Sequence, residues 1–194
     1  MLALIAVSAA ISAVAAGAQD KPAAHKFLIA THQQQGPFFE TVILLVDYDQ
    51  SGAMGLIVNR PSRIAVAKVL PQVKELEGRK DRLFVGGPVS LDHLMLLIRA
   101  KKAPPHSTHV VDDVYASGSI DTLRDLASGA LSDANFRAYA GYAGWAAGQL
   151  DAELARGAWR VLPASANEVF TTQPDQLWQD LDERSKGILV DLAP

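Results

Sequence analysis

The sequence contains no cysteine. This absence excludes disulfides, thiolate metal ligands, cysteine nucleophiles and lipid attachment through cysteine, and it fits both reducing and oxidising compartments. An excess of positive charge is also missing, because 18 Lys and Arg residues stand against 21 Asp and Glu residues, for a net charge of −3. Such a chain has no overall field that attracts phosphate backbones. The composition therefore gives no support to nucleic-acid binding.

Several catalytic signatures are absent as well. The chain has no G-x-x-x-x-G-K-[ST] loop, no G-x-S-x-G nucleophile elbow and no G-x-G-x-x-G dinucleotide fingerprint. It also lacks an internal repeat with a period of roughly 20–50 residues. Hydrophobic residues make up 49% and charged residues 20% of the 194 residues, which is typical of one globular domain. We predict no cofactor and no metal.

The N-terminal segment has the pattern of a secretory signal. No charged residue occurs from Leu2 to Ala18, and the run ends in small residues before polar ones. The run is shorter than the roughly 20 apolar residues of a membrane span. We expect a signal peptide at 1–18, cleavage after Ala18, a periplasmic or secreted protein and no permanent membrane span. Because no Lys or Arg precedes the run, a membrane anchor, a misassigned start and a cytoplasmic location are the alternatives.

The rest of the chain alternates between strand-like and helix-like segments. Short apolar runs rich in β-branched residues favour buried strands, and a change to helical spacing favours helices. We predict a linker at 19–25, one domain at 26–184 and a C-terminal tail at 185–194. The predicted strands are 26–30, 41–46, 53–59, 83–85, 94–98, 110–115, 136–140 and 158–162. The predicted helices begin at Ser62, Ser119, Gln149 and Pro174.

A glycine–aromatic segment at residues 141–150 is the most unusual stretch of the chain. Its glycines permit positive φ or close backbone approach, and its aromatics supply large apolar bodies with polar tips. One interpretation is a tight strand-to-helix corner packed against the core. The other is a platform for a ligand or partner, with free backbone N–H groups before a helix. The candidate binding residues are Gly141, Tyr142, Gly144, Trp145, Gly148 and Gln149.

Two further turns are candidates for a binding surface. Asn59, Arg60 and Pro61 follow a predicted strand, and the guanidinium fork of Arg60 suits a carboxylate or phosphate, with a salt bridge to a nearby acid as the alternative. Gly86 and Gly87 form a turn that backbone or ligand can approach closely. If the fold joins these turns to the glycine–aromatic segment, they form one concave surface that tolerates anions.

Candidate residues for catalysis or metal binding are few. His106 and His109, followed by Asp112 and Asp113, form the only cluster that resembles a metal site, and a solvated loop is the favoured interpretation. Paired carboxylates at Asp47 and Asp49 favour a capped turn over catalysis. The neighbours Asp92 and His93 resemble an acid–base pair but favour a surface turn.

Several motifs follow one another in a characteristic order. They are Ala30-Thr31, Pro37-Phe38-Phe39, 41–45, 52–61, Gly86-Gly87-Pro88-Val89 with Asp92, 141–150 and Ala158-Trp159. In this order they resemble the YqgE/AlgH family over roughly residues 26–182. The resemblance implies an α+β fold in which a bifurcated mixed β-sheet curls into a pseudo-barrel with flanking helices. It implies little about activity, although the family carries a transcriptional-regulator label.

These observations favour a non-enzymatic binding or regulatory module in the cell envelope. Its partner would be a protein or a small anionic ligand, and an exported copy would not contact nucleic acid directly. A hydrolase that uses His and Asp residues is one alternative, and the absence of a recognisable nucleophile or metal signature counts against it. A cytosolic transcriptional regulator is the other.

Overall fold

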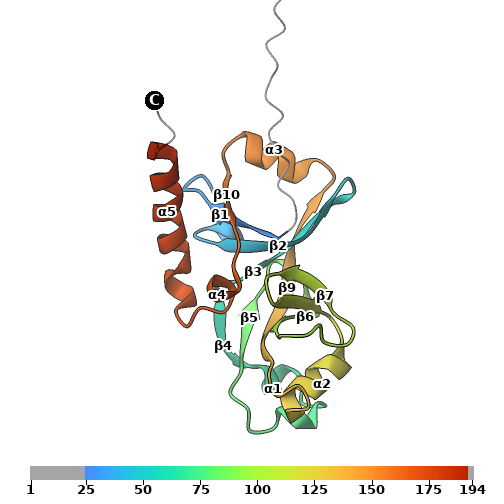
Figure 1. Ribbon diagram of the computed structural model, residues 1–194. Helices are drawn as coiled ribbons and strands as arrows, with labels where there is room; N and C mark the ends of the chain where they lie inside the picture. The colour runs from blue at the N-terminus through green and yellow to red at the C-terminus, as the bar shows by residue number, and fades with distance from the viewer. Residues whose placement is uncertain (1–24, 192–194) are drawn as a thin grey trace, which may run out of the picture.

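The structure is a computed structural model that describes residues 25–191, with side chains described as far as Lys186 (Figure 1). The expected signal peptide and most of the expected linker lie outside these residues. The strands are β1 (Lys26–Ala30), β2 (Val42–Asp49), β3 (Gly52–Ile57), β4 (Pro61–Ala65), β5 (Arg82–Val85), β6 (Val89–Arg99), β7 (Thr108–Val111), β8 (Val114–Ser117), β9 (Asn135–Ala146) and β10 (Trp159–Pro163). The helices are α1 (Val66–Val69), α2 (Ile120–Ser128), α3 (Gln149–Ala155), α4 (Ala166–Val169) and α5 (Leu177–Asp191), with 3₁₀ turns η1 (Gly36–Phe38), η2 (Lys74–Leu76) and η3 (Pro174–Gln176).

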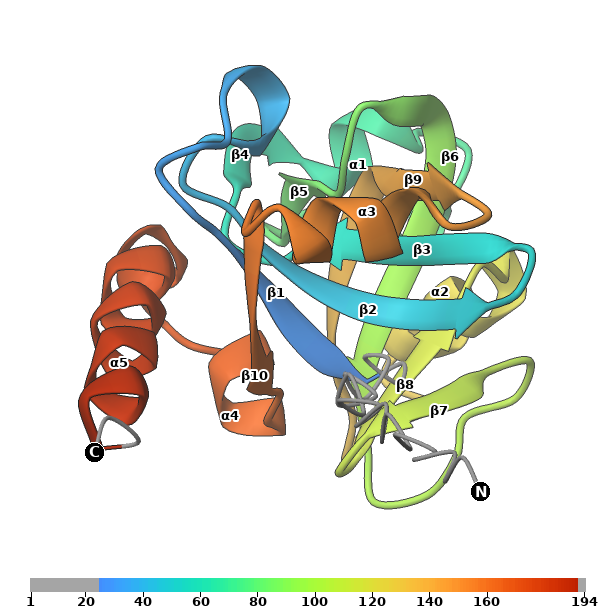
Figure 2. The same cartoon turned by 90° about the horizontal axis from the view of Figure 1, so that it is seen from above.

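One sheet contains all the strands of the described residues and divides at β9. Its main path runs β10-β1-β2-β3-β9-β6-β8-β7, and β4 and β5 form a branch. β3 pairs with the end of β9, whereas β5 runs parallel to its middle, along Ala138–Ala140. The sheet curls, and helices flank it on several sides (Figure 2). This arrangement confirms the predicted α+β fold with a bifurcated, mixed sheet.

Gly141 changes the direction in which β9 presents its side chains. Its φ of 68° lies in the left-handed region. Before it, Ala138 packs under α2 and Tyr139 enters the central core; after it, Tyr142 points to the central core and Trp145 to a third cluster under α3. A residue with positive φ breaks the regular alternation of a strand. β9 therefore serves three apolar clusters, and the sheet is packed on both faces.

The predicted helix start at Ser119 and the predicted capped turn at Asp49 are confirmed. Ser119 caps α2 by accepting a hydrogen bond from the Thr122 backbone N–H, and Gly129, at φ 82°, follows its last residue. The turn between β2 and β3 is held by Asp49, whose carboxylate accepts a hydrogen bond of 2.7 Å from the Ser51 backbone N–H. These turns follow from side chains close in sequence.

The predicted helix beginning at Ser62 is wrong. That segment is β4, and only Val66–Val69 is helical. The Val85 N–H donates to the Arg60 carbonyl and the Val66 N–H to the Asp81 carbonyl, both at 2.9 Å. These hydrogen bonds to β5 and to the residue before it keep the chain extended. Tertiary pairing therefore overrides the local helix signal.

The glycine–aromatic segment and the predicted strand 110–115 also differ from expectation. β9 continues through Ala146, which confines the strand-to-helix corner to Ala147 and Gly148. The strand 110–115 is instead the hairpin of β7 and β8, which turns at Asp112 with φ 50°. α5 continues to Asp191, so the first part of the expected tail is helical. Among the described residues, no helix combines the length and apolarity needed to cross a membrane.

Candidate functional site

The predicted glycines come together in a backbone crossing. The Gly86 N–H donates to the Ala140 carbonyl and its carbonyl accepts from the Ile57 N–H, both at 2.8 Å. A Cβ at Gly87 would overlap the backbone of Tyr142, and a Cβ at Gly141 would lie 2.6 Å from the Gly87 carbonyl oxygen. Glycine is therefore required for the approach of two backbones. The chain itself fills the space that a ligand would need.

Asn59 and Arg60 hold the loop that precedes β2. The Asn59 amide accepts from the Val42 N–H at 2.9 Å and donates to the Glu40 carbonyl at 3.0 Å. The Arg60 guanidinium donates to the Pro37 carbonyl and, at 2.7 Å, to the Phe39 carbonyl. Burial lowers the pKa of Arg60. Its fork therefore binds backbone carbonyls rather than an acidic side chain.

Trp145 is buried and forms part of a carboxylate cluster with α3. Its indole Nε1 donates to Glu153 Oε2 at 2.9 Å, and the Trp159 indole donates to the same oxygen at 2.8 Å. Gln149 donates to the other carboxylate oxygen at 3.1 Å. Phe38 covers Trp145 with ring centroids 6.4 Å apart. Trp145 is thus covered by a side chain of its own chain, and the concave surface expected from Arg60, the glycine turn and Trp145 stays a prediction.

Gly148 and the cluster of His109, Asp112 and Asp113 have structural surroundings of their own. Gly148 has φ 73° and immediately precedes α3. The His109 ring lies 2.8 Å from the Asp112 carbonyl, and the Asp112 carboxylate accepts from the Ala166 N–H at 2.9 Å. Asp113 pairs with Arg99 at 3.0 Å. Within the described part of the chain, no group of three or more His, Asp or Glu side chains is placed to hold a metal.

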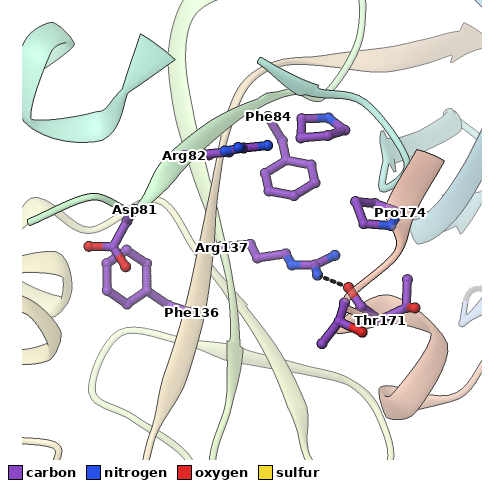
Figure 3. A pocket seen from close by; sticks show the side chains of 9 residues that line it. Asp81, Arg82, Phe84, Phe136, Arg137, Thr171 and Pro174 are labelled. Atoms are coloured by element: carbon purple, nitrogen blue, oxygen red, sulfur yellow. Dashed lines mark hydrogen bonds between the residues drawn. The ribbon is translucent and has the colours of Figure 1, made fainter. Parts of the chain in front are cut away.

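An open pocket of about 260 Å³ lies where β4 and β5 meet β9 and the segment that follows α4 (Figure 3). Pro61 is the one residue of the sequence-based set that lines it. We name it the Arg82–Arg137 pocket. It is smaller than the roughly 300–1,000 Å³ typical of sites for whole drug-sized ligands, so its size suits a small group. Its lining residues are Pro61, Asp81, Arg82, Phe84, Phe136, Arg137, Thr171, Thr172 and Pro174.

Arg137 is held rigidly in this pocket. Its guanidinium lies 4.8 Å from the centre of the Phe84 ring and 5.6 Å from that of Phe170. It donates to the Val169 carbonyl at 2.7 Å and to the Thr171 carbonyl (Figure 3). A guanidinium has five N–H donors, so these two bonds leave others available. The contacts fix the orientation of a cation without neutralising its charge.

Arg82 supplies a second positive charge. It is exposed at the start of β5, and its guanidinium has no hydrogen-bond or ion-pair partner among the side chains of residues 25–186. The only carboxylate of the pocket, Asp81, already binds Arg79 Nε at 2.6 Å. The pocket therefore combines two guanidinium groups with apolar walls from Phe84 and Pro174. Guanidinium groups of this kind bind carboxylates and phosphates through paired hydrogen bonds.

Beneath Arg137 lies a buried hydroxyl. Tyr139 is fully buried, and its hydroxyl lies near Arg137 without a hydrogen bond of ordinary geometry among the described residues. Burial raises the pKa of Tyr139 far above its ordinary value, and the charge and polar contact of Arg137 offset only part of that effect. The Tyr139 hydroxyl therefore stays neutral in the central core. Its ring packs against Phe84, which lines the pocket, with ring centroids 5.3 Å apart.

Sequence reasoning missed this pocket because its parts are distant in the chain. Arg82 appears in a charged turn, Arg137 in an alternating strand, and Thr171 in a segment without a distinctive pattern. The alternation of β9 was the only available signal, since it places Arg137 on the same face as Tyr139. Nothing local marks Thr171 as its neighbour.

Comparisons with known proteins give a consistent result. The model of the AlgH-like family matches residues 27–189. A UPF0301 protein from Stutzerimonas stutzeri is 40% identical over 161 residues, covering 80% of this chain and 84% of the relative, and one from Thermobifida fusca is 36% identical over 177 residues, covering 86% and 88%. None of these names states an activity.

Solved structures agree with these matches. The solution structure of AlgH from Pseudomonas aeruginosa superposes with a TM-score of 0.70 at 31% identity, covering 88% of this chain and 94% of that protein. A crystal structure from Corynebacterium diphtheriae gives a TM-score of 0.71 at 23% identity, covering 85% and 88%, and supports the fold alone. The chain belongs to the AlgH-like family.

Proposed function

We propose that this protein is a non-enzymatic binding module whose ligand carries a small anionic group, a carboxylate or a phosphate. The Arg82–Arg137 pocket would hold that group. The observation that carries the proposal is the pair of guanidinium groups on apolar walls, of which that of Arg82 has no partner among the side chains of residues 25–186. An anion there would bind a fixed fork at Arg137 and recruit Arg82 from solvent.

The chemistry of the pocket favours binding over catalysis. General acid–base or nucleophilic catalysis needs a base and a partner within hydrogen-bond reach. The side chains that line this pocket offer two guanidinium groups, which stay protonated, and two threonine hydroxyls. Asp81 is the one candidate base, and its carboxylate is bound to Arg79. These groups recognise an anion without supplying a proton acceptor.

Titration by NMR tests the pocket directly. Inorganic phosphate and acetate serve as probes, and the amide and arginine Nε–H signals of the purified chain are followed. We expect shifts confined to β5, the middle of β9 and residues 171–174, and a loss of affinity of about tenfold or more in Arg82→Gln. Arg124→Gln is the matched control, because Arg124 is an exposed arginine on α2 that pairs with Asp121 at 2.7 Å. Equal losses in both variants would contradict a specific site.

We also propose that the protein acts in the cell envelope, after export and cleavage behind Ala18. The uncharged run from Leu2 to Ala18, closed by small residues, supports this location. The intact mass of the protein from fractionated native cells is the test. A chain that starts at Gln19 in the periplasmic fraction agrees with export and rules out direct contact with DNA. An uncleaved chain in the cytosol would overturn the proposal and favour the regulator alternative.

A further inference from the structure

The short helix α1 lies between two grooves on the face of β5 opposite to the Arg82–Arg137 pocket. Side chains of a strand alternate between its faces, so Leu83 points away from the face that carries Arg82 and Phe84. The first groove, of about 170 Å³, is apolar apart from Asp92 and His93, and its apolar lining is Val69, Leu70, Leu83, Leu91, Leu94 and Ala140. The second, of about 730 Å³, is open and contains Lys68, Lys74 and Arg79. We name them the apolar groove and the basic groove.

Two exposed hydrophobic side chains share the apolar groove. Six large hydrophobic side chains are exposed among the described residues, and five of them belong to residues 64–91. Val69 and Leu91, which are 42% and 61% exposed, line the apolar groove itself. Single exposed hydrophobics are ordinary, but exposed apolar side chains that share a groove mark an interaction site. The other three in this range are Ile64, Val85 and Val89.

A bulge in β6 fixes Leu91 in its exposed position. β6 pairs with β9 at Val89 opposite Tyr142 and again at Leu94 opposite Ala140, so the four residues between Val89 and Leu94 stand opposite Gly141 alone. A Cβ at Gly141 would lie 3.1 Å from the Leu91 side chain. Bulges of this kind redirect side chains while the flanking ladder stays bonded. Leu91 is therefore presented from a backbone anchored on both sides.

Charge distinguishes the basic groove from the apolar groove. Its lining carries Lys68, Lys74 and Arg79 against one carboxylate, that of Glu77, in a chain whose net charge is −3. Arg79 is paired with Asp81, but the ammonium groups of Lys68 and Lys74 have no ion-pair or hydrogen-bond partner among the side chains of residues 25–186. Two ammonium groups in an open groove attract carboxylates. The uncompensated charge adjoins the exposed apolar side chains.

We propose that the two grooves together bind a short acidic segment of a partner protein. Its apolar side chains would occupy the apolar groove, and its Asp or Glu carboxylates would contact Lys68 and Lys74. Asp92 in the apolar groove disfavours carboxylates there, which fixes the orientation of the segment across α1. The hollowed shape of both grooves suits a polypeptide better than the plane of a membrane. This proposal does not depend on the Arg82–Arg137 pocket.

Selection of peptides displayed on phage against the purified full chain tests the proposal. We expect the selected peptides to combine Asp or Glu with at least one large apolar residue. Their binding, measured by fluorescence anisotropy, should weaken about tenfold in Leu91→Ser and in Lys68→Glu, and should weaken further as salt concentration rises. Leu91→Met should retain binding, because it keeps an apolar side chain. Lys102→Glu changes the same charge at an exposed lysine outside both grooves and should have no effect.

The possible outcomes separate the proposal from its alternatives. Thermal unfolding of each variant shows whether it is folded, and these exposed positions should leave it unchanged. Peptides without acidic residues, or equal weakening by Lys102→Glu, would overturn the proposal. Preferential binding to phosphatidylglycerol vesicles that is lost in Lys68→Glu would assign the face to a membrane instead. Sedimentation of the chain as a dimer that Leu91→Ser dissociates would assign it to self-association.

Discussion

Removal of the Glu153 carboxylate should destabilise the protein more than any other single change in α3. One carboxylate oxygen of Glu153 accepts the indole N–H groups of Trp145 and Trp159, at 2.9 and 2.8 Å. All three residues are buried. In Glu153→Ala both indoles lose their acceptor, and each buried donor without a partner costs about 1–3 kcal/mol. We therefore expect a loss of about 2–6 kcal/mol, a large share of the 5–15 kcal/mol of a typical domain.

Urea unfolding followed by tryptophan fluorescence measures this loss directly, because two of the reporters are in the cluster. Glu153→Gln should cost less, about 1–2 kcal/mol, since its amide oxygen still accepts from the indoles while its NH₂ group faces the Gln149 donor. Glu75→Ala removes an exposed glutamate of η2 and is the control, with an expected change below about 0.5 kcal/mol. A loss below about 1 kcal/mol in Glu153→Ala would refute the reasoning.

The same cluster predicts a dependence on pH. Burial raises the pKa of Glu153, but hydrogen bonds from Trp159, Trp145 and Gln149 and the charge of Arg156 outweigh it, so the pKa lies below its usual value of 4.5. A lowered pKa in the folded state stabilises the fold above the pKa of the unfolded chain, and this contribution disappears as pH falls through the folded value. The free energy of unfolding should therefore decrease below about pH 4.5. Glu153→Gln should reduce that decrease.

Three further changes test other parts of the structure. Gly87→Ala should lower the free energy of unfolding by more than about 3 kcal/mol or prevent folding. Gly78 also has a positive φ, 76°, but no neighbour within 4 Å, so Gly78→Ala should cost only about 1 kcal/mol. Similar urea midpoints for the two variants would contradict the close backbone approach at Gly87. Tyr139→Phe removes a hydroxyl without a partner and should be neutral or stabilising by about 1 kcal/mol in the same assay, so a clear loss would mean that the hydroxyl is bonded. Arg160→Met leaves the buried Asp182 with one cation fewer, so it should lower the free energy of unfolding by about 2–3 kcal/mol and speed amide hydrogen exchange in α5. Unchanged exchange would show that the Arg160–Asp182 pair does not hold the helix.

Sequence patterns predicted those parts of the fold that depend on neighbouring residues. The cap at Ser119 and the Asp49 turn are made by side chains within three residues of their partners. The β4 segment failed this approach, since Ser62 looks like a helix cap until pairing with β5 is known. Its hydroxyl instead accepts from the Ile64 N–H at 3.0 Å, inside the extended segment. The backbone hydrogen bonds that join this segment to β5 and to Asp81 are non-local, and they leave no local signature.

The candidate site was the least predictable part, because the unusual residues of the sequence do not line the open pocket. The glycines and aromatics concentrated in residues 141–150 and the Gly86-Gly87 turn were the sequence-based candidates, but Trp145 is 6% exposed and Gly87 lies against the backbone of Tyr142. The pocket is instead made of ordinary residues that the sheet brings together. Arg137 reaches Thr171 across 34 residues of sequence. Only the three-dimensional fold shows that these residues lie in one pocket.

The glycines nevertheless act on the proposed α1 surface indirectly. Gly141 allows the backbones of β9 and the turn at Gly87 to cross, and the same residue stands opposite the four bulged residues of β6. A side chain at Gly141 would collide with the Val89 carbonyl and press on Leu91. Restoring a regular strand there would return Leu91 to the alternation of β6 and remove it from its exposed position. The glycine that looked like a ligand contact is thus the residue that keeps the Leu91 side chain exposed on the proposed α1 surface.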